Sequence, residues 1–160
     1  MRRILLDTNL LIAALDQDNQ TSIDKKEEAV QLLTDLLNNS NVALAITPLI
    51  RYEVLRGIAW KDSVRYEELK DTLKYFEEVD IGSDVSELAA NLYRFDIAKA
   101  KANNEKRNFE KRKFDIFHLA SAQCHKLELV SQDSDIAKLQ TLYIDYIKAT
   151  IRPKKEFLID

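Results

Sequence analysis

Short apolar runs alternate with helical stretches along the whole chain, and this alternation is the strongest constraint on how it folds. Apolar runs of strand length occupy residues 2–7, 42–46, 77–81 and 127–131. Between them, apolar residues recur at the spacing of amphipathic helices. Strands that alternate with helices build a mostly parallel sheet with helices packed on it. Residues 1–160 are therefore predicted to form a single α/β domain.

The segment KATIRP, residues 148–153, predicts a fifth strand at one edge of the sheet. Pro153 has no N–H to donate to a neighbouring strand, so it fits only an edge position. The chain contains only two glycines and two prolines, which favours long helices and few tight turns. The predicted architecture is a central sheet of four to five strands flanked by helices.

The net charge of −3 gives no general sign of a nucleic-acid-binding protein, but one segment departs from this average. Residues 99–113 hold seven lysines or arginines against two glutamates, a net of +5, which leaves −8 for the rest of the chain. Such a segment is either a solvated helix face with charge pairs one turn apart or a surface that binds phosphates. The best candidates for phosphate contact are Lys106, Arg107, Lys111, Arg112 and Lys113.

The sequence shows no targeting or membrane-spanning segment. No apolar run approaches the roughly 20 residues of a transmembrane helix, and Asp7 interrupts the chain where a signal peptide would continue its apolar core. The single cysteine, Cys124, cannot form an internal disulfide, which suits a reducing compartment. We therefore expect a cytoplasmic protein.

A carboxylate, Asp7, interrupts the first apolar stretch, ILLDTNLLIAAL, where an unpaired charge would be costly to bury. Asp133 follows the fourth apolar run, while Glu53 and Asp115 lie early in helices that would begin near the same edge of the sheet. Converging carboxylates raise each other's pKa values unless a cation lies between them, and oxygen ligands suit Mg²⁺ or Mn²⁺. Together the four acids predict a metal site, whereas each alone would more often cap a helix or lie in solvent.

Four segments around these acids resemble, in order and spacing, the motifs of a known family. They are LLDTNLLIAAL, YEVLRG, FDIFHLASA and LVSQDSDI, and PKKEFL is similar to many C-termini of that family. The chain thus resembles the PIN-domain nucleases nearly from end to end, and looks most like the VapC-type toxins of prokaryotic toxin–antitoxin pairs. The fourth motif departs from the common pattern, with Ser131 in place of threonine and Ile136 in place of an aromatic residue. The stretch before Asp115 is also unusually long, basic and free of glycine.

The resemblance implies a three-layer, Rossmann-like fold and a Mg²⁺- or Mn²⁺-dependent site that hydrolyses single-stranded RNA with a metal-activated water. It also implies a homodimer and inhibition by a cognate antitoxin. Carried over by position, the catalytic and metal-binding acids are Asp7, Glu53, Asp115 and Asp133, with Asp135 assisting. Thr8, Asn9 and Ser131 would orient carboxylates and water. Arg56 would contact a substrate phosphate or, as we favour, pair with a neighbouring carboxylate and organise the site.

Three alternatives stay open on the sequence alone. A haloacid-dehalogenase-like phosphatase would need a second acid two residues after Asp7, where this chain has Asn9. A PIN relative that only binds RNA or a protein would usually lack one of the four acids. A housekeeping PIN nuclease of RNA processing, without an antitoxin, would have the same motifs as a toxin. His118, one turn after Asp115, is expected to pack in the core or to support the site.

Overall fold

Four parallel strands form the central sheet, in the order β3-β2-β1-β4. The computed structural model describes residues 1–151. Its strands are β1 (Arg2–Leu6), β2 (Val42–Ile46), β3 (Glu77–Glu78) and β4 (Glu128–Val130). The predicted α/β fold with a parallel sheet is therefore confirmed. β3 is shorter than the predicted run 77–81 because its neighbour β2 ends at Ile46.

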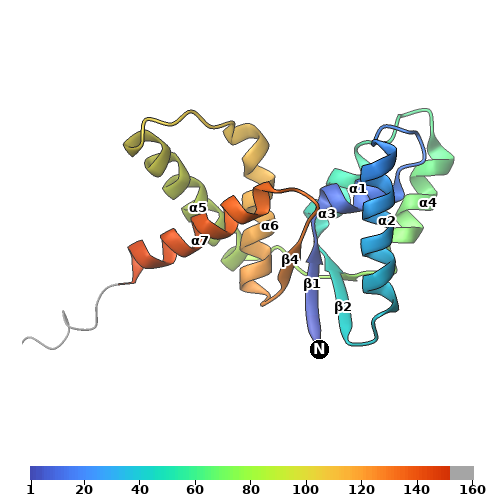
Figure 1. Cartoon of the computed structure of the whole chain (residues 1–160), viewed down its shortest axis with the longest axis horizontal. Helices are drawn as coiled ribbons and strands as arrows, with labels where there is room; N and C mark the ends of the chain where they lie inside the picture. The colour runs from blue at the N-terminus through green and yellow to red at the C-terminus, as the bar shows by residue number, and fades with distance from the viewer. Residues whose placement is uncertain (152–160) are drawn as a thin grey trace, which may run out of the picture.

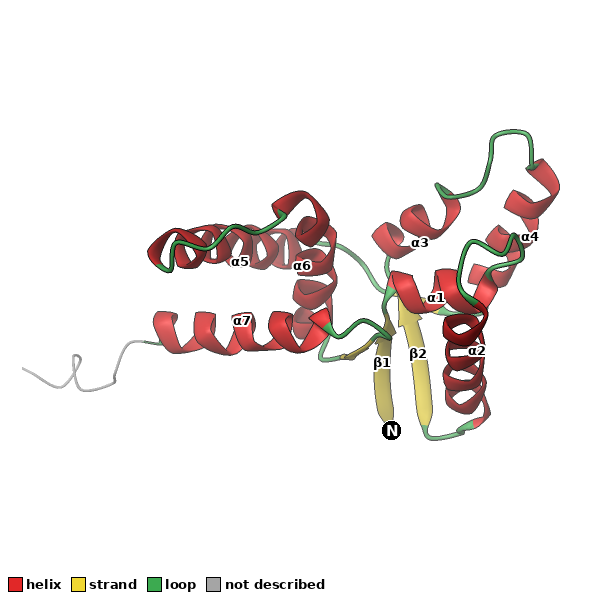
Figure 2. Ribbon diagram, turned by 45° about the horizontal axis from the view of Figure 1, so that its top comes forward, coloured by secondary structure: helices red, strands yellow, loops and turns green. Residues whose placement is uncertain are grey.

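Within residues 1–151, seven helices cover the two faces of this sheet, so the fold has three layers (Figure 1). They are α1 (Thr8–Leu15), α2 (Ile23–Asn38), α3 (Pro48–Leu55), α4 (Ser63–Leu73), α5 (Ser83–Ala102), α6 (Phe109–Cys124) and α7 (Asp135–Thr150). The first four lie on one side of the strands and the last three on the other, where α5 and α7 extend away from the sheet (Figure 2). No helix of the described residues is both long and apolar enough to cross a membrane.

Side chains cap the start of both helices that carry predicted site acids, α3 and α6. The side-chain oxygen of Thr47 accepts a hydrogen bond from the backbone N–H of Ile50 at 3.2 Å, and Pro48 is the first residue of α3. Asn108 caps α6 in the same way, since its Oδ1 accepts from the N–H of Lys111 at 3.2 Å. These caps fix where α3 and α6 begin, and with them the positions of the acids that these helices carry.

The predicted fifth strand is wrong for residues 148–150, which form the last turn of α7. Leu142 is buried in this helix and Tyr146 is partly buried one turn later, so the helical period continues past the expected end. The backbone N–H of Ile151 donates to the carbonyl of Ile147 at 2.9 Å and closes the helix. The rest of KATIRP and the PKKEFL segment lie outside the described residues.

Two clusters of buried apolar side chains hold the layers together. The larger, around Leu5, Leu10 and Leu73, lies between the sheet and α1 to α4. The smaller, around Leu92 and Leu119, joins α5, α6 and α7. Each fully buried leucine contributes about 2 kcal/mol relative to an exposed one. Because α6 packs on α5 and α7 and also against β1 and β4, it brings the residues on its inner face to the edge of the sheet.

The strand order reverses between β1 and β4, and this reversal positions the site. From β1 the chain adds β2 and β3 on one side and then adds β4 on the other. Leu6 is in register with Val130, and the N–H of Asp7 donates to the Val130 carbonyl at 2.9 Å. In open parallel sheets, ligands bind outside the carboxyl ends of the strands at such a reversal. The residues that follow β1 and β4 therefore lie side by side where a ligand is expected.

Candidate active site

Asp7 lies at this reversal, directly after β1, and its side chain is fixed by a residue that follows β4. It is buried, and its Oδ2 accepts a hydrogen bond of 2.6 Å from the hydroxyl of Ser131. The Ser131 oxygen in turn accepts the backbone N–H of Asp133 at 2.9 Å. Serine in place of the family's threonine thus still provides the hydroxyl that orients the carboxylate.

Glu53 reaches the same place from α3, where two side chains hold its carboxylate. The hydroxyl of Thr8 donates to Oε1 of Glu53 at 3.0 Å, and Nε2 of His118 lies 2.5 Å from the same oxygen. Oγ1 of Thr8 and Nε2 of His118 are themselves 3.3 Å apart, and both residues are buried. A buried carboxylate that is held by several hydrogen bonds is oriented before any ligand arrives.

His118 was expected from the sequence only to pack in the core or to support the site, and the structure places it directly against the acids. Its Nδ1 is buried and has no hydrogen-bond partner among the described residues. Donor atoms of Asp7, Asp115 and His118 all lie within 4.8 Å of one another, close enough to share one metal ion. The sequence indicated a site role for His118 only through its position one turn after Asp115 in FDIFHLASA. A histidine on an apolar helix face is more often a core residue.

Asp115 lies where its charged form is disfavoured. Burial and the charges of Asp7, Glu53 and Asp133 together raise its pKa from 3.8 to about 6, against an opposing effect of His118. Desolvation and like-charge repulsion both disfavour the ionised carboxylate. A cation between these groups would relieve the repulsion. The donor set, carboxylate oxygens with one imidazole, fits Mg²⁺ or, more readily because of the nitrogen, Mn²⁺.

A small cavity lies between the acids. Its volume is about 10 Å³, close to the space that one water needs, and it is lined by Asp7, Asp115, Leu129, Ser131, Asp133, Asp135, Ile136 and Leu139. Asp133 is fixed there by its Oδ1, which accepts the backbone N–H of Asp135 at 3.0 Å. The carboxylate of Asp135 also faces Lys111 and Lys138, at 3.7 Å and 3.4 Å. Four of the five predicted acids therefore line one cavity, with Asp135 beside two lysines, and Glu53 borders the adjoining groove together with Asp115.

A larger groove opens from the acids toward solvent. It has a volume of about 510 Å³ and is lined by Asn9, Tyr52, Glu53, Arg56, Glu110, Lys111, Lys113, Phe114 and Asp115. Asn9 thus borders the site without contacting a carboxylate among the described residues. The pairing that we favoured for Arg56 is not what the structure shows: its guanidinium carbon lies 5.3 Å from the ring centre of Tyr52 and 5.2 Å from that of Phe114. Two aromatic faces take the place of the expected carboxylate partner.

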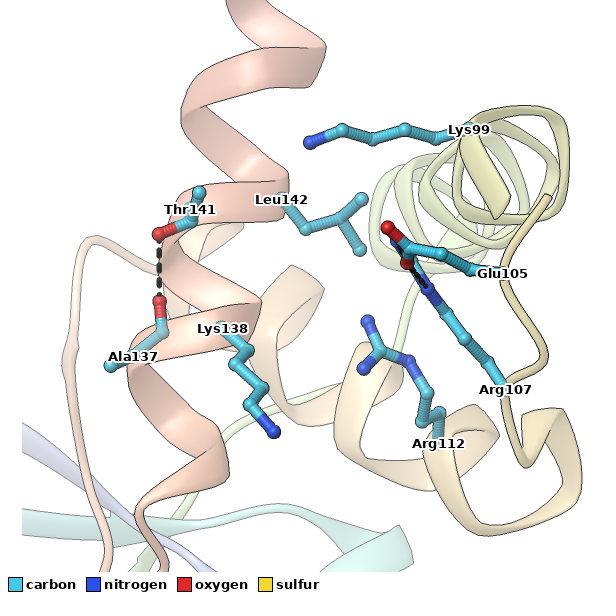
Figure 3. Close-up of a pocket in the computed structure, with 8 residues that line it drawn as sticks. All are labelled: Lys99, Glu105, Arg107, Arg112, Ala137, Lys138, Thr141 and Leu142. Carbon is cyan, nitrogen blue, oxygen red and sulfur yellow. Dashed lines mark hydrogen bonds and ion pairs between the residues drawn. The ribbon is translucent and has the colours of Figure 1, made fainter. Parts of the chain in front are cut away.

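The basic segment divides into two parts. Lys111 and Lys113 line the groove of the acids, and Lys106 is exposed in the preceding loop. Arg107 and Arg112 instead bind Asp96, whose side chain is 0% exposed, and line a separate pocket against α7 (Figure 3). That pocket, of about 490 Å³, is bordered by none of the five acids within the described chain. The structure thus assigns these two arginines to a buried ion pair, and leaves the two lysines beside the acids.

Comparisons with known proteins agree with this geometry. Residues 4–142 match the PIN domain family. VapBC2 from Rickettsia felis, solved with a DNA fragment from its promoter, is 16% identical and has a TM-score of 0.57, covering 85% of this chain and 92% of that one. A toxin–antitoxin complex from Klebsiella pneumoniae is 24% identical with a TM-score of 0.51, covering 82% and 87%.

FitAcB from Neisseria gonorrhoeae is 22% identical with a TM-score of 0.56, covering 82% of this chain and 88% of that one. At these identities the three structures show a shared fold. A comparison with curated proteins found no match. The family match spans both clusters of the core and all five acids, and it confirms the resemblance seen in the motifs. The chain belongs to the PIN-domain family.

Proposed function

We propose that this protein is a Mg²⁺- or Mn²⁺-dependent endoribonuclease that hydrolyses single-stranded RNA. PIN domains are a family of nucleases. The observation that carries the proposal is the convergence of Asp7, Glu53, Asp115 and Asp133 at the strand reversal, next to a groove that contains Lys111 and Lys113. Acids that hold a cation and lysines that hold phosphates are the two parts that a phosphodiesterase site requires.

In this proposal Asp7, Asp115 and Asp133 hold the ion, and Glu53 lies beside it, oriented by Thr8 and His118. A bound divalent ion makes a coordinated water more acidic and stabilises negative charge on the phosphate oxygens. Ser131 keeps Asp7 aimed at the cavity through its hydrogen bond. The oxygen of a water would bond to phosphorus while the bond from phosphorus to the leaving ribose oxygen breaks and that oxygen takes up a proton, so the chain's own role would be to orient water and substrate.

Cleavage of a labelled single-stranded RNA by the purified protein tests this proposal. We expect cleavage with Mg²⁺ or Mn²⁺ and none with EDTA, and little cleavage of a DNA strand of the same sequence. RNA that stays intact under all conditions, with no rise in melting temperature on adding metal, would contradict the proposal. It would point instead to a PIN relative that only binds RNA or a partner.

We further propose that the nuclease is the toxin of a VapBC-type pair, acting as a homodimer in the cytoplasm and inhibited by a cognate antitoxin. The motifs support this role, as does the shared fold with VapBC2 and with a protein solved in a toxin–antitoxin complex. Induced expression in a bacterial host should arrest growth for the wild type but not for Asp7→Asn. Co-expression of a small DNA-binding protein encoded by a neighbouring gene should restore growth. Unaffected growth with an active nuclease would favour a housekeeping role in RNA processing.

A further inference from the structure

Three residues at the mouth of the acidic groove form a cluster that the metal chemistry does not use. Tyr52 and Arg56 are one helical turn apart at the end of α3, and Phe114 faces them from α6. The guanidinium carbon of Arg56 is 5.3 Å from the centre of the Tyr52 ring and 5.2 Å from that of Phe114. The same three residues line the groove that contains Glu53 and Asp115.

Two of the three residues, Tyr52 and Arg56, are exposed, whereas a purely structural role would favour burial. Tyr52 is 52% exposed, although its ring already has a cation at one face. Arg56 is exposed as well and forms no ion pair among the described residues, although it lies in a groove with three acids. An aromatic ring and a flat guanidinium, both open to solvent, are the surfaces on which unpaired nucleic-acid bases stack.

The lysines of the groove complete the arrangement. Lys113 lies 5.4 Å from the centre of the Phe114 ring, and Lys111 lines the same groove. The aromatic rings therefore share one groove with the cations that can hold phosphates and with the acids that can hold a metal ion. A strand that places a phosphate at the acids would have its neighbouring base within reach of Tyr52 and Arg56. A base inside a duplex is already stacked on its neighbours and could not be received there.

We propose that Tyr52 and Arg56 form a stacking subsite that receives one unpaired base next to the scissile phosphate and so selects single-stranded substrate. This inference rests on the proposed nuclease function, because it takes the acids as the place where the phosphate binds. It assigns to Tyr52 the role of a specificity-determining residue. Phe114 supports the subsite through its contact with Arg56, whose guanidinium carbon lies 5.2 Å from the centre of the Phe114 ring.

The subsite can be tested by binding, independently of cleavage. In an Asp7→Asn background, which prevents cleavage, 2-aminopurine is placed in turn at each position of a short single-stranded RNA. We expect its fluorescence to be quenched on binding at one position, where the base stacks. Tyr52→Leu keeps the apolar bulk but not the ring, so it should abolish this quenching and raise the Kd about tenfold. Tyr52→Phe should restore both to within about threefold.

Tyr75→Leu is the matched control, because Tyr75 is 88% exposed just after α4 and lies outside the groove. It should bind like the parent, and melting temperatures verify that each variant is folded. Equal quenching and equal Kd in Tyr52→Leu and the parent would overturn the subsite. Failure of the subsite can be told apart from failure of the nuclease proposal. A Tyr52→Leu enzyme with unchanged KM and metal-dependent cleavage would refute only the subsite. RNA that stacks on Tyr52 but is never cleaved would refute the nuclease and leave Tyr52 as a base-binding residue without a scissile phosphate beside it.

Discussion

Nε2 of His118 lies 2.5 Å from Oε1 of Glu53, in a site that is otherwise built from carboxylates. The two residues are 65 positions apart, on α6 and α3, and the hydroxyl of Thr8 lies beside the contact, 3.0 Å from the Glu53 oxygen and 3.3 Å from the His118 nitrogen. The side chains of Glu53 and His118 are 12% and 1% exposed, so water offers little substitute for this contact. The orientation of Glu53 therefore depends on how two helices pack.

We expect His118→Ala to lower both the affinity for Mn²⁺ and the rate of RNA cleavage by about 10–100-fold, because Glu53 loses a neighbour that orients it. Calorimetric titration of Mn²⁺ and single-turnover cleavage measure the two effects. His125→Ala is the control, since Nε2 of His125 lies 2.7 Å from the carbonyl of Asp80, away from the acids. Equal effects of the two substitutions would show that the histidine beside Glu53 has no special role.

The raised pKa of Asp115 predicts a pH dependence of stability in the metal-free protein. Its pKa is 3.8 in an ordinary setting and about 6 in the fold, so the folded chain binds this proton more tightly than the unfolded chain. The stability from protonated Asp115 is therefore complete below pH 3.8 and is lost as the pH rises to about 6. In EDTA, the melting temperature of the wild type should fall relative to that of Asp115→Asn over this range. Parallel pH profiles of the two proteins would show that Asp115 titrates normally.

Neutralising the two lysines of the groove should weaken RNA binding mainly at low salt. Lys111→Gln with Lys113→Gln removes two charges beside the acids. For a single strand, two lost phosphate contacts lower the slope of log K against log salt by about 1.4. Fluorescence anisotropy at several salt concentrations measures the slope. Lys101→Gln, an exposed position at the end of α5, should leave it unchanged. An unaltered slope in the double variant would make these lysines part of a solvated helix face.

The buried carboxylate of Asp96 should matter for stability more than for chemistry. Asp96→Asn removes the buried charge that pairs with Arg107 and Arg112, each with a side chain 19% exposed, although Arg107 keeps its pair with Glu105. Removing one partner of such a buried network costs about 3 kcal/mol. Urea denaturation measures the loss. Asp71→Asn breaks an exposed pair with Lys74 and should change the unfolding free energy by less than about 0.5 kcal/mol. Similar losses in both variants would mean that burial adds nothing to the Asp96 network.

The sequence was sufficient to predict the parts of the site that follow from strand direction. Asp7 and Asp133 come after apolar runs, and the carboxyl ends of parallel strands share one edge of a sheet. Glu53 could be placed because Thr47 and Pro48 mark the start of its helix so clearly. These are local signals, and they carry over to the fold without knowledge of how the helices pack.

Other features depend on packing between distant segments and could not be predicted in this way. The contact between His118 and Glu53 exists because α6 and α3 meet at the edge of the sheet. Arg107 and Arg112 face away from the acids because Asp96, which looks like any acid on α5, is buried beneath them. Because buried Asp96 binds the two arginines, only Lys111 and Lys113 of these basic residues border the groove.

The most direct test of the account is single-turnover cleavage of a labelled single-stranded RNA in Mn²⁺ by the wild type, Asp7→Asn and Asp115→Asn. Asp18→Asn, an exposed acid beyond α1, serves as the matched control. We predict that both site variants cleave at least ~100-fold more slowly, because each loses an oxygen that holds the ion, while the control cleaves at the wild-type rate. Wild-type cleavage by Asp7→Asn would contradict the account, since the carboxylate at the strand reversal would then take no part in the chemistry.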